Sequence, residues 1–358
     1  MPINLPVRVA PEPTRGLLFI GDPHLWSSRP GRRRDPSFQE TVLKKIDAAA
    51  EVSNARQLWP IFLGDLFHAP DDNDTAMLVA LVQRLQSFKR RPLTAEGNHD
   101  KSELLLAAHN PLALLQATGQ IEVLTQSGPW AQLALESEQG HRHKIWIGGT
   151  PYGQPLPTTF ENAFGQARPV EVDTALWLTH EDLAFEGAYP GSLPLHAISG
   201  VDMVVNGHMH GHKRPVAVEG TAYYNPGNIT RMSVDMAEHV PAVWEWSPFG
   251  NDGMASASGQ RVPALLRHVL PHKPAAETFD FEGRHTRQVA LMPAVVPENS
   301  QFVRIMAMDP NEQRTDDGAY AQETLTQVLD ELHAPEQVRT ITDHLCRKAI
   351  RQHQERSE

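Results

Sequence analysis

Short apolar segments of this chain repeatedly end in an aspartate, an asparagine or a histidine. Runs of about four to eight apolar residues bounded by turn residues are typical of buried β-strands. Residues 17–20 are followed by Asp22, and residues 58–63 (LWPIFL) are followed by Asp65. In α/β folds, ligands bind at the carboxyl ends of the strands. We therefore expect these polar side chains to gather at one edge of a sheet.

The segments between the strands have the spacing of amphipathic helices. Apolar residues recur every three or four positions over residues 38–49 and again over residues 78–88. This alternation of strands and helices over residues 16–250 predicts an α/β sandwich with helices outside the sheets. Further strands are predicted at residues 121–125, 130–136, 144–149, 175–179 and 202–206.

A composition change predicts a domain boundary near residue 250. Residues 247–260 are rich in glycine, serine and alanine and have no apolar periodicity. We expect a first domain over residues 1–250 and a small C-terminal α+β module over residues 251–358. The predicted elements of this module are strands at 262–270, 277–282 and 301–308, and helices with apolar stripes at 325–332 and 338–349.

Composition narrows the class of protein. The sequence contains no run of about 18 apolar residues, so no membrane span is predicted. The first residues lack the pattern of a signal peptide. The single cysteine, Cys346, fits a reducing cytoplasm, where we expect the protein to be located. A net charge of −11 is not that of a protein that coats nucleic acid. It leaves a nuclease possible, because charge can be local.

One such local charge is RPGRRR, residues 29–34, which has four arginines in six residues. A solvated surface loop is the simpler interpretation of a charge run taken alone. The alternative is a contact between Arg32, Arg33 and Arg34 and the phosphates of DNA.

The polar residues that follow the strands form the order D-x-H, GD, GNHD, H, GHxH. Oxygen and imidazole donors without thiolates suit Mn²⁺, Fe²⁺ or Zn²⁺. They exceed the needs of one tetrahedral ion. One shared carboxylate would instead give two ions, roughly 3.5–4 Å apart, that grip a phosphoryl group. The candidate ligands are Asp22, His24, Asp65, Asn98, His180, His208 and His210.

These motifs resemble those of the calcineurin-like metallophosphoesterase superfamily, over about residues 16–235. The resemblance implies a four-layer αββα sandwich and two divalent metal ions, with Asp65 as the bridging ligand. It implies that His99 is not a ligand but faces the scissile phosphate and helps to protonate the leaving oxygen. His212 has no ligand role in the pattern. By the same resemblance one ion is held by Asp22, His24, Asp65 and His210, and the other by Asp65, Asn98, His180 and His208.

Within the superfamily, the chain most resembles the DNA-repair nucleases of the SbcD type, including the nuclease subunit of the MRN complex. GDLFHAP resembles the segment of that family in which an extra histidine, here His68, orients the catalytic one. The opening GDPHLW with its basic loop, and YYNPGNITR at residues 223–231, are similar too. Asn228 departs from the serine that is usual there. The tail matches the family's capping and docking regions in size and pattern only.

The resemblance implies a DNA exonuclease or endonuclease with two Mn²⁺ ions, in which a metal-bridging hydroxide attacks the phosphorus. It also implies an SbcC-like coiled-coil ATPase as a partner, and a homodimer is open. The alternative is a phosphodiesterase or phosphatase for a small molecule such as a cyclic nucleotide, because the same ligands serve both. A phosphoprotein phosphatase is less expected, since GDLFHAP lacks that family's phosphate-binding arginine. A non-catalytic scaffold is disfavoured because His99 and every ligand are present.

Overall fold

A computed structural model of the 358-residue chain describes residues 7–8, 12–71, 74–103, 105–188, 191–250, 253–257 and 259–281. Internal contacts divide the chain into two units, Met1–Gly283 and Arg284–Glu358, and all described residues belong to the first. The strand predicted at 301–308 and the two predicted helices that follow it lie outside the described residues.

The first sheet has six strands and is centred on a fully buried one, β2. Leu17 and Phe19 of β2 pack in one apolar cluster, and Leu18 and Ile20 pack in another on the opposite face. A strand buried on both faces is apolar throughout, which explains why its run is continuous. The order of the sheet is β15 (Leu266–Val269), β12 (Ala242–Trp246), β2 (Gly16–Ile20), β3 (Leu58–Phe62), β4 (Leu93–Ala95) and β5 (Glu122–Leu124).

The second sheet has seven strands and packs against the first. Leu176 and Leu178 of β8 share an apolar cluster with Leu17 and Phe19, so the core between the sheets is continuous. A separate pair is formed by β13 (Met254–Ala255) and β14 (Arg261–Val262). The order of the second sheet is β1 (Val7–Arg8), β6 (Gly128–Glu136), β7 (Arg142–Thr150), β8 (Thr174–Thr179), β9 (Met203–Asn206), β11 (Thr221–Asn225) and β10 (Lys213–Val218).

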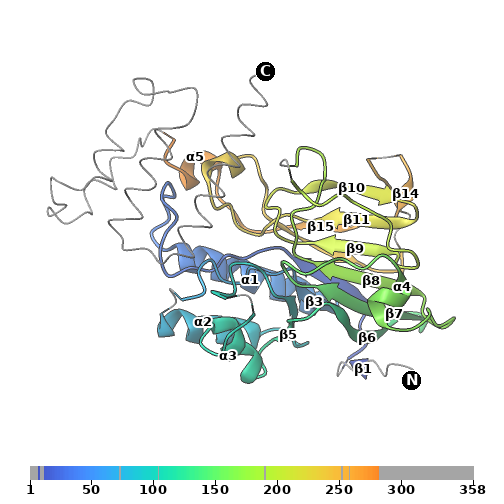
Figure 1. Cartoon of the computed structure of the whole chain (residues 1–358). Helices are drawn as coiled ribbons and strands as arrows, with labels where there is room; N and C mark the ends of the chain where they lie inside the picture. The colour runs from blue at the N-terminus through green and yellow to red at the C-terminus, as the bar shows by residue number, and fades with distance from the viewer. Residues whose placement is uncertain are drawn as a thin grey trace, which may run out of the picture. The chain divides into compact units, whose positions relative to one another are not determined.

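Helices lie on the outer faces of both sheets (Figure 1). Three of them, α1 to α3, bury their apolar faces against the six-stranded sheet, and α4 packs with loops on the other one. The predicted sandwich and its first two helices are confirmed. The fourth layer has less helix than four full layers imply. The helices are α1 (Phe38–Ala55), α2 (Thr75–Leu85), α3 (Pro111–Ala117), α4 (Phe160–Phe164) and α5 (Ala275–Thr278), with the 3₁₀ helix η1 (Val234–Met236).

Two predictions about the segment after residue 250 differ from the structure. The expected boundary at 250/251 does not separate the sheets, because β15 pairs with β12 and extends the six-stranded sheet. The strand predicted at 277–282 is wrong, since Pro274 precedes the single helical turn of α5. Phe279 then becomes fully buried, so its apolar character reflects an anchor rather than a strand. Within the described ranges, no helix is both long and apolar enough to cross a membrane.

A buried carboxylate ties this added strand to the rest of the sheet. Glu245 of β12 accepts hydrogen bonds from Arg56 and from Nε2 of His268 on β15, the latter at 2.8 Å. Its side chain is 7% exposed. Burial raises the pKa of Glu245, but the hydrogen bonds from His268 and Arg56 outweigh burial and hold the pKa below its usual range. The ionised form is therefore the one that the fold stabilises.

We expect Glu245→Gln to lower the free energy of unfolding at neutral pH by about 1–3 kcal/mol, because it removes charge-assisted hydrogen bonds from a buried place. The folded-state pKa lies below the unfolded value of about 4.3. The stabilisation is therefore present above that value and is lost as the pH falls through the folded pKa. Urea unfolding of the wild type and of Glu245→Gln at decreasing pH should show the difference in their free energies of unfolding closing. The exposed Glu171→Gln is the control, and a difference that persists at low pH would contradict this account.

Candidate metal centre

The expected ligand side chains lie in loops that follow strands of both sheets. The loop after β2 carries Asp22 and His24, and the loop after β3 carries Asp65. The carboxyl ends of these strands thus deliver polar side chains to one place, as the sequence predicts. The remaining residues follow β4, β8 and β9 and are Asn98, His99, His180, His208 and His210.

Asp22, His24 and His210 form one group, in which the ligand atoms lie within 4.8 Å of one another. The Nε2 atoms of His24 and His210 are 3.0 Å apart, and the side chain of His24 is fully buried. Two imidazole nitrogens that converge beside a carboxylate are arranged to share one cation.

Asp65, His180 and His208 form a second group with the same spread of ligand atoms. Oδ1 of Asn98 lies 3.3 Å from Nε2 of His180 and 3.0 Å from Nδ1 of His208. Nδ1 of His180 is 2.7 Å from the carbonyl oxygen of Leu63, to which it donates, so Nε2 is the nitrogen that faces the group. This second group therefore combines two imidazoles with carboxylate and amide oxygens.

Asp65 lies between the two groups. Its Oδ2 atom is 3.7 Å from Nε2 of His24 and 3.2 Å from Nε2 of His180. Its Oδ1 atom accepts a hydrogen bond from the backbone N–H of His99 at 2.8 Å. Three buried oxygens lack a well-formed hydrogen bond within the described residues: Oδ2 of Asp65 and both carboxylate oxygens of Asp22. Burial of such oxygens is costly without a cation, so the donors fit a pair of divalent metal ions.

The charges of the cluster change the protonation of its members. Burial raises the pKa of Asp22 to about 7. Burial lowers the pKa of His180, but the carboxylates of Asp65 and Asp22 outweigh burial and raise it to about 10. For Asp65, burial raises the pKa, but His180 and His24 outweigh it and hold the pKa well below its usual range. A divalent cation would favour the ionised forms of Asp22 and Asp65. It would also displace the proton from the nitrogen of His180 that faces the group.

Three residues of the cluster have a left-handed backbone conformation. The φ angles are 48° at His24, 44° at Asp65 and 66° at His208. Residues other than glycine pay about 1–3 kcal/mol for such a conformation and keep it only where the surroundings enforce it. The loops therefore hold strain in order to aim these side chains.

Asp100, which the sequence reasoning did not select, ties two of the loops together. Its buried carboxylate accepts hydrogen bonds from the backbone N–H groups of Phe67, at 3.1 Å, and Gly97, at 3.0 Å. Burial raises the pKa of Asp100 to about 7. The only signal in the sequence was its place in GNHD, next to the predicted catalytic residue.

Two asparagines, also not selected, hold the histidine loops after β8 and β9. Asn206 exchanges two hydrogen bonds with the backbone of Glu181, each at 3.0 Å, and donates to Oδ1 of Asn225. Asn225 donates to the carbonyl oxygens of Met209, at 2.7 Å, and Gly211, at 2.9 Å. Each asparagine is the last residue of its strand, which was the available signal.

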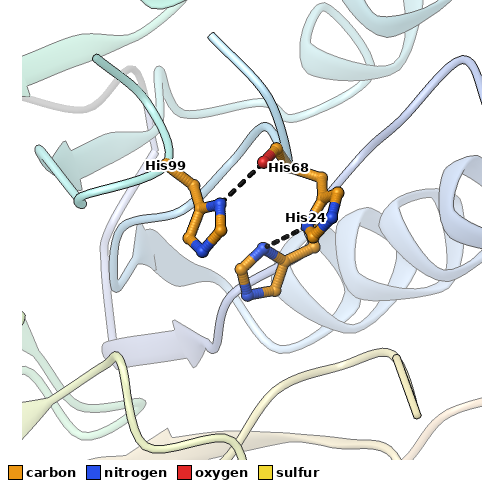
Figure 2. A group of neighbouring side chains, drawn as sticks. All are labelled: His24, His68 and His99. Atoms are coloured by element: carbon orange, nitrogen blue, oxygen red, sulfur yellow. Dashed lines mark hydrogen bonds between the residues drawn. The ribbon is translucent and has the colours of Figure 1, made fainter. Parts of the chain in front are cut away.

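His99 and His68 lie together beside His24, a member of the first group (Figure 2). Nδ1 of His99 donates to the carbonyl oxygen of His68 at 2.7 Å, so Nε2 of His99 is left to act on a ligand. The two rings are stacked, with centroids 5.1 Å apart and an interplanar angle of 15°. Burial lowers the pKa of His68 to about 4, so this ring is neutral at neutral pH. His212 lies elsewhere and stacks on Trp244 at 4.6 Å.

The arginine loop has two kinds of side chain. Arg33 is 4% exposed, and its guanidinium pairs with Asp35 at 2.6 Å and lies over the ring of Phe279. This engagement inside the protein does not agree with the predicted contact between Arg33 and DNA. Arg32 and Arg34 are exposed and hydrogen-bond to Asp280, so contact with DNA stays a prediction for these two.

Gly97 lies too close to Asp65 to carry a side chain. A Cβ atom at Gly97 would be 2.2 Å from Oδ1 and 2.4 Å from the backbone nitrogen of Asp65. We expect Gly97→Ala to cost about 1–3 kcal/mol of stability by overpacking and to reduce the bound metal by moving Asp65. Thermal unfolding and elemental analysis measure the two effects. Gly31→Ala, which meets no atom within 4 Å, is the control. Normal stability together with full metal content in Gly97→Ala would contradict the geometry.

Several solved structures are similar to this chain at low sequence identity. The 5'-nucleotidase precursor from Thermus thermophilus is 15% identical with a TM-score of 0.40, and the match covers 72% of this chain and 54% of that longer one. A dimetal phosphatase from Danio rerio is 12% identical with a TM-score of 0.40, and the match covers 73% and 100% of the two chains. A hypothetical protein from Thermus thermophilus is 13% identical with a TM-score of 0.37, with 71% and 99% covered.

The comparison of sequences is more informative. No curated protein matches the chain. The model of the family described as calcineurin-like phosphoesterase matches residues 16–212, which is more than half of the chain and includes every expected ligand. With the two groups of candidate metal ligands, this match shows that the chain belongs to the calcineurin-like phosphoesterase family of metal-dependent phosphoesterases.

Proposed function

We propose that this protein is a two-metal-dependent phosphodiesterase that cleaves DNA, with Mn²⁺ as its metal. The position of Asp65 supports the pair of ions, because one of its oxygens faces both groups of ligands. We assign one ion to Asp22, His24, Asp65 and His210, and the other to Asp65, Asn98, His180 and His208.

The ions, when bound, would activate a water molecule and neutralise charge on the phosphate. His99 supplies the proton for the leaving oxygen. Its Nδ1 is fixed by the carbonyl oxygen of His68, which leaves Nε2 to carry that proton. His99 also lines the open cleft beside Asp65, His208 and His210. A group with these properties is suited to general acid catalysis.

The cleft beside the metal ligands supports a substrate larger than a bare phosphate. Its volume is about 460 Å³, and it is also lined by Asp182, Lys213, Asp235 and His239. Pockets for drug-sized ligands are about 300–1,000 Å³. The cleft is therefore large enough for a ligand bigger than a phosphate ion, and we propose that it holds a nucleotide unit with its phosphate at the metal ligands.

The observation that supports DNA as the substrate is the pairing of His68 with His99. His68, the histidine of GDLFH, stacks on His99, and this contact supports the orienting role that the resemblance to the SbcD-type nucleases implies for it. We propose an SbcC-like coiled-coil ATPase as the partner and a homodimer as the assembly. The helix predicted at residues 338–349, for which docking of that ATPase is the alternative to packing on the preceding helix, lies outside the described residues.

A substrate panel tests the proposed function. With Mn²⁺ present, we expect cleavage of single- and double-stranded DNA to exceed hydrolysis of cyclic AMP and of bis-p-nitrophenyl phosphate. His99→Gln should lower the DNA rate by a factor on the order of 10²–10⁴, since it removes the acid, while the bound metal stays constant. Efficient hydrolysis of cyclic AMP without cleavage of DNA would favour the small-molecule phosphodiesterase instead.

The arginine loop gives a second test, because its side chains differ in burial. We expect the double variant Arg32→Ser, Arg34→Ser to weaken DNA binding and to flatten its dependence on salt, since fewer counterions are released. Arg33→Ser should instead lower the melting temperature, because it removes the ion-pair partner of Asp35. Fluorescence anisotropy at several salt concentrations and thermal unfolding separate the two effects. An unchanged salt slope in the double variant would show that the exposed arginines do not contact DNA.

A further inference from the structure

The two ring nitrogens of His24 face different partners. Nε2 points to the first group of metal ligands, 3.0 Å from Nε2 of His210 and 3.7 Å from Oδ2 of Asp65. Nδ1 points away from that group and lies 3.5 Å from Nδ1 of His68 (Figure 2). His24 therefore connects the first metal group to a histidine outside it.

The positions of the protons follow from this arrangement. A neutral imidazole carries one proton, and the nitrogen that binds a metal must present a lone pair. If Nε2 of His24 binds the metal, its Nδ1 carries the proton and can only donate. Nδ1 of His68 must then be the acceptor, and the proton of His68 must be on Nε2.

The ring of His68 is held in place for this contact. Trp26 lies on it with centroids 4.5 Å apart, and His99 stacks on it at 5.1 Å. The link from His68 to His99 uses a different atom, the backbone carbonyl oxygen, which any residue at this position would supply. The side chain of His68 is thus not needed for the hydrogen bond that fixes His99.

We propose that His68 is a positioning residue for the metal ligand His24, whose Nδ1–H it accepts, in addition to the role at His99 that the resemblance implies. This inference rests on the metal assignment proposed above. A histidine that binds a metal through one ring nitrogen donates the N–H of the other nitrogen to a partner, and this partner fixes the ring orientation. Loss of the partner typically weakens metal binding by about 10–100-fold. His68 would fill this role with an imidazole instead of the usual carboxylate or carbonyl.

Two substitutions separate the acceptor from the ring. His68→Phe keeps a planar ring between Trp26 and His99 but removes the acceptor. His68→Asn removes the ring but keeps an acceptor oxygen close to the position of Nδ1. Competition with a chromophoric chelator gives the affinity for Zn²⁺ and Mn²⁺ at both sites, independent of activity. The exposed His141→Phe is the control.

We expect His68→Phe to weaken the metal affinity of one of the two sites by about 10–100-fold. His68→Asn should keep most of the wild-type affinity at that site. Wild-type affinity in His68→Phe, or a loss in His68→Asn equal to that in His68→Phe, would overturn the proposal. A wild-type protein that binds fewer than two metal ions would contradict the proposed function instead.

Nitrogen NMR of the zinc-loaded wild-type protein decides the question even if a variant does not fold. The spectrum should place the proton of His24 on Nδ1 and that of His68 on Nε2. A proton on Nδ1 of His68 would show that this atom is not the acceptor, and the proposal would be wrong.

Discussion

The carboxylate of Asp65 is the constraint on which the site depends. It is buried, one oxygen faces imidazoles of both ligand groups, and the other accepts the N–H of His99. A buried charge is tolerated only when it is paired and hydrogen-bonded. The two sheets must therefore bring cationic or metal-binding partners to Asp65 from several strand ends at once. The packing of the two sheets around one core places those strand ends together.

The loops meet this demand at a cost in backbone conformation. His24, Asp65 and His208 each have a positive φ angle, and Gly97 must lack a side chain so that Asp65 can approach it. Buried polar side chains, above all Asp100, hold these loops by hydrogen bonds to the backbone. The packed core offsets the destabilisation that comes from the strained loops, and this arrangement is common at functional sites.

Much of this arrangement was accessible from the sequence. A strand that is buried on both faces has a continuous apolar run, so runs such as residues 17–20 could be recognised as strands. The polar residues that follow these runs meet at the ends of the strands. The sequence did not reveal Asp100, whose role is to accept two backbone N–H groups, because such bonds depend on how distant loops meet. It also misplaced Arg33: a charged residue in a basic run is normally solvated, but here Asp35 and Phe279 enclose it. The alternating phenylalanines near residue 280 mimicked a strand for a similar reason, because burial of Phe279 comes from tertiary contact.

Anomalous diffraction from crystals grown with Mn²⁺ tests the central claim most directly. Two peaks per chain are expected, roughly 3.5–4 Å apart, with Asp65 within bonding distance of both, His24 and His210 at one peak, and His180 and His208 at the other. A single peak, or a pair of peaks of which Asp65 contacts only one, would contradict the account.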